Sequence, residues 1–137
     1  MEPFDESKCQ TSEVSDASSF EGFVDYKWEL LHDAFACTTG VYEAWWRANA
    51  LFPDRAVSER LAMAEQAMRE LLAEGLIVLI RDEADPQGSE IPSSDTEEVL
   101  KRIDTWEVAY EGIKVYFTTT SAGDRLVKEG GKPKGTG

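Results

Sequence analysis

The stretch from Val57 to Asp82 constrains the fold more than any other part of the chain. Its apolar residues recur at helical spacing, so it predicts an amphipathic helix whose apolar stripe needs a core to cover it. Gly75 follows this pattern, where a chain leaving a helix often turns left-handed. Leu76 to Ile80 is apolar and rich in branched residues, which indicates a buried strand. The stripe comprises Val57, Leu61, Ala64, Met68, Leu71 and Leu72.

Turn-forming residues divide the rest of the chain into shorter predicted elements. Thr38-Thr39-Gly40 separates two helices before the central one, and either Asp54 or Ser58 caps the central helix. A second break, rich in Pro, Gly, Ser and acid, follows the strand. The further predicted elements are a helix from an Asp25 N-cap to about Cys37, a helix from Val41 to Ala50, a helix from a Ser94–Glu97 capping box through Val99, Leu100, Ile103 and Trp106, a strand from Lys114 to Thr119 and a short helix capped by Ser121.

The length of 137 residues favours one domain. We expect a flexible acidic leader at 1–20, a folded domain at 21–129 and a flexible tail at 130–137. No apolar run approaches the roughly 20 residues that span a bilayer, and the acidic start does not resemble a secretory signal. The expected location is therefore cytoplasmic, with Cys9 and Cys37 as reduced thiols.

The formal charge of −13 is concentrated in two segments. Residues 1–25 carry a net charge of −6 and residues 83–98 another −6, whereas residues 26–82 and 99–123 together carry only −3. Such a field repels nucleic acid and attracts basic partners. Acidic charge also keeps a protein soluble without further function, and the charge map leaves both interpretations open.

Two stretches resemble winged helix-turn-helix regulators of the MarR and PadR type. LLAEGLI at 71–77 looks like the join between the third helix and the wing, and YFTTTSAGDRL at 116–126 is similar to the second wing strand and the next helix. The resemblance covers roughly residues 25–128. It implies an α+β winged helix of three helices and a two-stranded antiparallel wing, with a short C-terminal helix. The chain departs from that pattern by a helical insert at 83–112 between the wing strands.

The resemblance also implies a DNA-binding role, in which the third helix enters the major groove. Arg55, Gln66 and Arg69 are the candidate contacts on that helix, although Glu65 is placed to pair with Arg69. Where a wing would meet phosphate, this chain has Glu83, Asp85 and Glu90, which oppose binding. A dimer or a basic partner subunit would be needed to offset them.

No stretch of the sequence predicts catalysis or a cofactor. A single Glu29-x-x-His32 pair lacks the second pair of a di-iron site. Asp82, Glu83 and Asp85 lack the glycine and glutamate of a calcium loop. The tail follows no strand, so its glycines do not form a phosphate loop. We expect no enzyme, no metal and no cofactor.

Large aromatic residues offer anchors for binding another protein. Trp45 and Trp46 diverge by about 100° on a helix, so one can enter the core while the other stays exposed. Burial of both is the competing interpretation. Trp106, in the insert, is the second candidate anchor.

The sequence as a whole favours a small non-enzymatic protein-binding module. Its acidic leader and insert would attract a basic, nucleic-acid-binding protein and mask or neutralise it, as immunity proteins, antitoxins and DNA mimics do. The predicted contact residues are Trp46, Glu83, Asp85, Glu90 and Trp106. The alternatives are a dimeric DNA-binding regulator and a structural subunit of a larger assembly.

Overall fold

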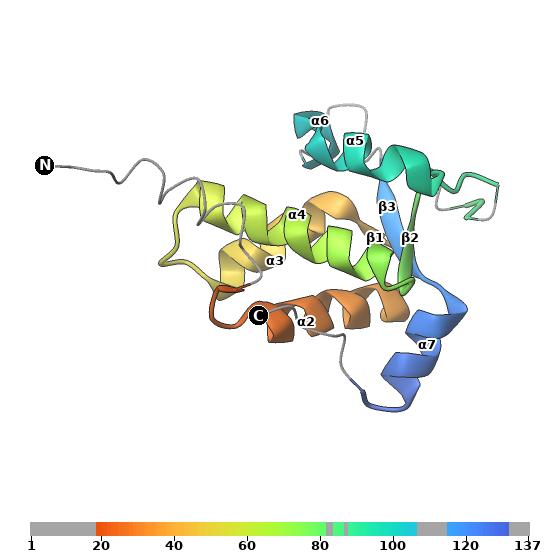
Figure 1. Ribbon diagram of the computed structural model, residues 1–137, viewed down its shortest axis with the longest axis horizontal. Coiled ribbons are helices and arrows are strands. Elements are labelled where there is room, and N and C mark those ends of the chain that lie inside the picture. Colours follow the sequence, from red (N-terminus) through yellow and green to blue (C-terminus); the bar gives the residue numbers. More distant parts are fainter. Residues whose placement is uncertain (1–18, 82–83, 87, 107–114, 132–137) are drawn as a thin grey trace, which may run out of the picture.

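The computed structural model describes residues 19–81, 84–86, 88–106 and 115–131, so most of the predicted leader and tail lies outside the described chain. The described chain is an α+β fold with a three-stranded antiparallel sheet (Figure 1). Its elements are α2 (Phe23–Ala36), β1 (Thr39–Gly40), α3 (Val41–Leu51), α4 (Val57–Ala73), β2 (Ile77–Ile80), the 3-10 turn η2 (Ser93–Asp95), α5 (Thr96–Lys101), α6 (Ile103–Trp106), β3 (Tyr116–Thr119) and α7 (Ser121–Lys128).

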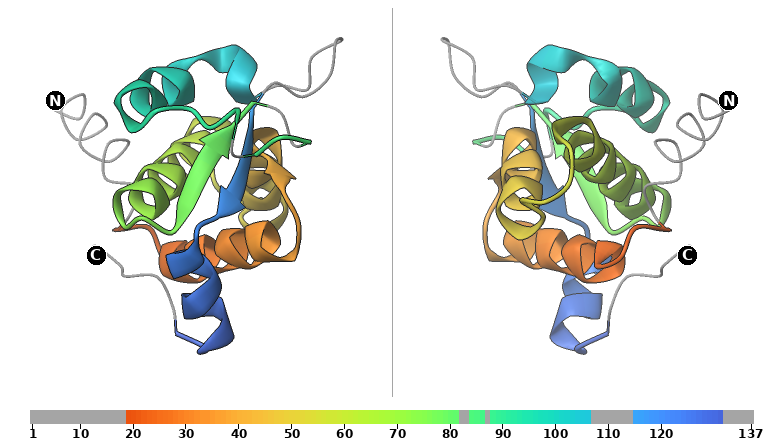
Figure 2. Two further views of the ribbon diagram at one scale, coloured as in Figure 1. Left: turned by 90° about the vertical axis from the view of Figure 1, so that its right-hand side faces the viewer. Right: turned by 90° about the vertical axis from the view of Figure 1, so that its left-hand side faces the viewer.

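Three helices, α2, α3 and α4, lie against one face of the sheet, while α5 and α6 lie beyond one end of it and α7 beyond the other (Figure 2). The core is closed between these helices and the strands. Burial of the Tyr26 ring raises the pKa of its hydroxyl, which donates a hydrogen bond of 2.6 Å to the Ala44 carbonyl oxygen. The largest fully buried apolar side chains are Trp106, Tyr26, Phe23, Phe117, Leu30, Leu31, Met63, Met68, Leu71, Ile77 and Leu79.

The sheet corrects the expectation of a two-stranded wing. Its strand order is β1-β3-β2, with Gly40 opposite Tyr116 and Leu79 opposite Phe117. The strand β1 lies where the sequence indicated only a break between helices. A strand of two residues has no room for an alternating pattern, so its pairing depends on β3 and leaves no local signal.

The central helix and the strand after it confirm the prediction for residues 57–82, except that Val57, the first residue of the apolar stripe, is 57% exposed. α4 ends at Ala73, and Gly75 leaves the helix with a φ of +74°. Its start differs from the expected Asp54 or Ser58 cap, because Ala56 is the N-cap and its backbone N–H donates to Glu59 Oε1 at 3.2 Å. No described helix is long and apolar enough to cross a bilayer.

The other two expected caps are also displaced. Gly22, with a φ of +86°, is the N-cap of α2, and Asp25 lies in the first turn, where a carboxylate favours the helix dipole. For α7 the N-cap is Thr120 and not Ser121, since Thr120 Oγ1 accepts a hydrogen bond from the Gly123 N–H at 3.1 Å.

The α7 cap also ties the end of β3 to the start of β2. Thr120 Oγ1 donates to the Gly75 carbonyl oxygen at 2.6 Å, and its N–H donates to the Leu76 carbonyl oxygen at 3.0 Å. A Cβ at Gly123 would lie only 2.3 Å from that Leu76 oxygen. Glycine is therefore required at Gly123 for the close approach of α7 to the strand.

The insert helix is broken where the sequence predicted one continuous helix. The backbone of Arg102 is extended, with a ψ of 132°. Two side-chain hydrogen bonds span the break: Thr105 Oγ1 donates to the Val99 carbonyl oxygen at 2.6 Å, and Trp106 Nε1 donates to the Leu100 carbonyl oxygen at 2.8 Å. These bonds make the break a defined corner, and the expected capping role of Glu97 gives way to a contact with α4.

Candidate functional site

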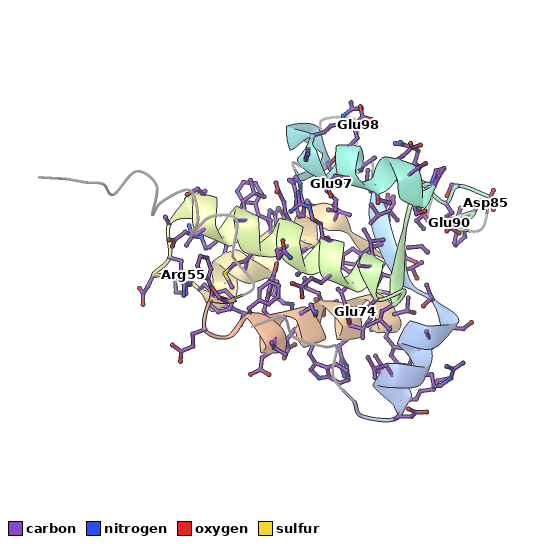
Figure 3. All side chains as sticks on the ribbon, in the orientation of Figure 1. Arg55, Glu74, Asp85, Glu90, Glu97 and Glu98 are labelled. Carbon is purple, nitrogen blue, oxygen red and sulfur yellow. The ribbon has the colours of Figure 1, made fainter. Side chains whose placement is uncertain are left out.

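The α4 residues predicted to contact DNA are engaged with carboxylates of the same chain. Arg69 Nε lies 2.9 Å from both carboxylate oxygens of Glu97 on α5, and its Nη2 lies 3.4 Å from Glu65 Oε1. Figure 3 shows Glu97 between the insert and α4. Glu97 of the insert therefore binds the arginine of α4 that was predicted to contact DNA.

Gln66 and Arg55 are engaged in the same way. Gln66 Nε2 donates to Glu70 Oε2 at 3.0 Å. Arg55 pairs with Glu59 at 3.7 Å, and its guanidinium lies 4.1 Å from the centre of the Phe20 ring. The structure thus brings none of the three predicted DNA contacts to the surface as an uncommitted group.

The two carboxylates beside Arg69 respond differently to it. Hydrogen bonding from Arg69 lowers the pKa of the exposed Glu97 carboxyl, despite a smaller opposing effect of burial. At Glu65, burial is the larger effect and raises the pKa, although Arg69 acts in the opposite direction. Arg69 therefore interacts more strongly with Glu97 than with Glu65. We expect the ion pair between α4 and the insert to contribute more to stability than the pair within α4.

We expect the Glu97→Gln variant to lose about 0.5–1 kcal/mol of stability at pH 7, a value limited by solvent screening of a half-exposed pair. Because folding lowers the pKa of Glu97 below 4.5, its contribution is present above that value and is lost as the pH falls through the lowered pKa. Urea unfolding at pH 7 and in steps below pH 4.5 measures this. The control is Glu98→Gln, which removes an exposed acid with no ion pair in the described chain. Equal losses at both positions would contradict the prediction.

The insert is anchored in the main core. Ile91, Val99, Leu100 and Trp106 are at most 6% exposed and belong to the same apolar cluster as α2, α3 and α4. Trp106 is 1% exposed, which corrects its expected role as a surface anchor. The sequence placed Trp106 on the same helix face as Val99, and both side chains are buried in the structure.

Outward-facing acids lie along the other side of the insert. Asp85, Glu90, Asp95 and Glu98 are exposed, and no basic side chain in the described chain pairs with them. Asp85 and Glu90 lie on the loop after β2, and Glu98 lies on α5 (Figure 3). Glu83, the remaining predicted acid, lies outside the described residues. The result is an acidic surface, Asp85–Glu90–Asp95–Glu98, on an insert whose apolar side chains are buried in the core.

Trp46 is the predicted anchor that does reach the surface. Its side chain is 55% exposed on α3, and its ring contacts that of Tyr42 edge to face at 4.7 Å. Trp45, its neighbour, packs against the core. The two indoles diverge as the helical spacing indicates.

Sequence reasoning missed a buried ion cluster between α2 and α4. Lys27 is 0% exposed, and its Nζ donates to Glu70 Oε1 at 2.6 Å and to Glu74 Oε2 at 2.8 Å. Glu74 is labelled in Figure 3 where α4 passes α2. A usable signal was present, since Lys27 falls among the buried positions of α2 and the two acids are four residues apart on α4. Enclosure of the ammonium group indicates a structural role.

In the described ranges, no three His, Cys, Asp or Glu side chains come together as a metal site. A surface hollow between α4 and the insert is lined by Arg69, Leu72, Ala73, Ser93, Thr96, Glu97 and Leu100. Comparison with protein-family models finds no match, and neither do comparisons with curated proteins and with solved structures.

Proposed function

We propose that this protein is a non-enzymatic binding module of the winged-helix type, whose acidic insert binds a basic protein. The observation that carries the proposal is the two-sided insert. One side is fixed to α4 by the Arg69–Glu97 ion pair and by buried Leu100 and Trp106. The other side displays the acidic surface Asp85–Glu90–Asp95–Glu98 to solvent without basic partners in the described chain.

The order of the elements supports the winged-helix part of the proposal. α2, α3 and α4 pack on one face of the sheet, and β2 and β3 follow α4 as an antiparallel pair (Figure 1). The insert then occupies the connection between the two strands. Under this proposal, the insert places an acidic surface where a DNA-binding winged helix has its wing.

Masking of a basic, nucleic-acid-binding partner fits the distribution of charge. Glu59 and Glu65 of α4 and Glu97 of the insert pair with Arg55 and Arg69 within the chain. The acidic surface Asp85–Glu90–Asp95–Glu98 has no basic partner in the described chain and is left to act on another molecule. Long-range attraction of this kind raises the rate of association and selects against acidic partners.

The same geometry disfavours the regulator alternative. To present Arg69 to DNA, the chain would have to break the bond to Glu97 and displace a segment whose Val99, Leu100 and Trp106 are buried. Exposing such side chains costs about 1.5–3 kcal/mol each. A DNA site on α4 would therefore require partial unfolding of the core.

We expect the Asp85→Asn/Glu90→Gln/Glu98→Gln variant to weaken binding of the basic partner about tenfold or more and to flatten its salt dependence. The matched control, Glu21→Gln/Asp54→Asn/Glu129→Gln, removes the same charge from exposed positions outside the insert. Capture with tagged protein from nuclease-treated and untreated lysates identifies the partner, and titration at several salt concentrations compares the variants.

Equal loss in both triple variants would show that only net charge matters and would overturn the assignment to the insert. Recovery of DNA and not protein, abolished by nuclease and by Arg55→Ala, would favour the regulator instead.

A further inference from the structure

The outer face of α3 carries an aromatic pair that the fold does not use in its core. Trp46 is 55% exposed, more than most other large hydrophobic side chains in the described chain. The Tyr42 and Trp46 rings meet at 87° with their centres 4.7 Å apart, so the tyrosine limits the orientations of the indole. An anchor whose rotamer is already restricted loses less entropy when a partner binds.

Acid and a third aromatic side chain border this pair. Glu43, exposed on the same turn of α3, accepts a hydrogen bond from the Gly40 N–H at 3.3 Å. Desolvation, the charge of Glu43 and the proximity of Tyr116 together raise the pKa of Tyr42, which therefore remains a neutral phenol. A cation approaching the Trp46 indole would meet π-faces and a carboxylate. The adjacent base on α3, Arg47, is engaged by Asp33, to which its Nε and Nη2 each donate at 2.7 Å.

The sheet connects this face with the acidic insert. Gly40, at the start of α3, is opposite Tyr116, which is opposite Ile80, which in turn forms a bridge with Glu90. Three interstrand steps of about 4.8 Å place Glu90 about 14 Å from Gly40. An extended peptide covers that distance with about four or five residues.

We propose that Tyr42, Trp46 and Glu43 form a docking site for an arginine or lysine side chain on an extended basic segment, which also contacts the acidic insert. This inference rests on the proposed function, because the same basic partner would occupy both surfaces. The guanidinium or ammonium group stacks on the indole, with Glu43 supplying the opposite charge. A second copy of this chain is a poor occupant, since each copy carries a formal charge of −13.

The experiment uses a ten-residue peptide of alternating arginine and glycine as the probe, titrated into the isotope-labelled full chain. The indole N–H signal of Trp46 is assigned by its disappearance in Trp46→Phe. We expect this signal to shift more than that of Trp28, and Trp46→Ala to weaken peptide binding about fivefold to thirtyfold, whereas Trp46→Phe keeps part of the affinity. Leu51→Ala, which truncates another exposed apolar side chain of α3, should leave binding unchanged.

The possible failures are distinguishable. If the insert triple variant weakens binding but Trp46→Ala does not, or the Trp46 signal moves no more than that of Trp28, the docking site is wrong and the acidic surface stands. If the insert variant has no effect while Trp46→Ala does, the proposed function of the insert fails and the aromatic site stands. Absence of peptide binding to the unmodified protein would overturn both.

Discussion

Replacing Lys27 with methionine is expected to destabilise the fold by about 3–5 kcal/mol, because it leaves a buried carboxylate without its cation. Glu70 is 7% exposed, and its Oε1 lies 2.6 Å from the lysine Nζ. Methionine preserves much of the apolar stem but supplies no charge and no donor. Urea unfolding followed by circular dichroism measures the loss.

The control is Lys101→Met, which removes a lysine that pairs with Glu97 at 3.7 Å while 67% exposed. That change should cost less than about 0.5 kcal/mol. The double variant Lys27→Met/Glu70→Gln should be about 1–2 kcal/mol more stable than Lys27→Met alone, since it also removes the buried carboxylate charge of Glu70. Similar losses for Lys27→Met and Lys101→Met would show that the cluster is not effectively buried.

Trp106→Ala should destabilise the whole domain by about 3–5 kcal/mol, through loss of a large buried side chain and the cavity that it leaves. The indole is 1% exposed and donates to the Leu100 carbonyl oxygen, which would also lose its partner. Since the insert shares the core with α2, α3 and α4, unfolding should remain a single transition.

Trp46→Ala makes the same chemical change at a side chain that is 55% exposed, and it should alter stability by no more than about 0.5 kcal/mol. Comparing the two variants separates burial from residue type. If Trp106→Ala gave a separate early transition for the insert, with the remaining fold unaffected, the insert would be an independent flap. In that case α4 could present Arg69 to DNA without unfolding the core.

Much of the fold could be predicted because its longest elements have strong local patterns. The stripe of α4, the positive φ at Gly75 and the branched residues of β2 follow from the sequence alone. The misses arise where tertiary contacts decide the outcome. β1 is extended because β3 pairs with it, and Lys27 is buried because Glu70 and Glu74 from another part of the chain enclose its ammonium group.

The candidate site was predictable only in part, for a related reason. The divergence of Trp45 and Trp46 follows from the angle between neighbouring residues on a helix, but the exposure of Trp46 in particular depends on how α3 packs. The pairing of Arg69 with Glu97 depends on how the insert packs against α4, which joins residues 28 positions apart and leaves no local pattern in the sequence.

The strand order has a consequence for how the chain acquires its structure during synthesis. β3 lies between β1 and β2, yet it is the last of the three strands to be made. Thr39 therefore has no strand partner until Phe117 has been synthesised. Until then, β2 presents an unpaired edge, which is a site for association between nascent chains. The three helices can collapse early, but the sheet closes only after the residues of β3 have left the ribosome. Chains truncated before β3 should therefore be aggregation-prone, because β2 lacks the strand that pairs with it.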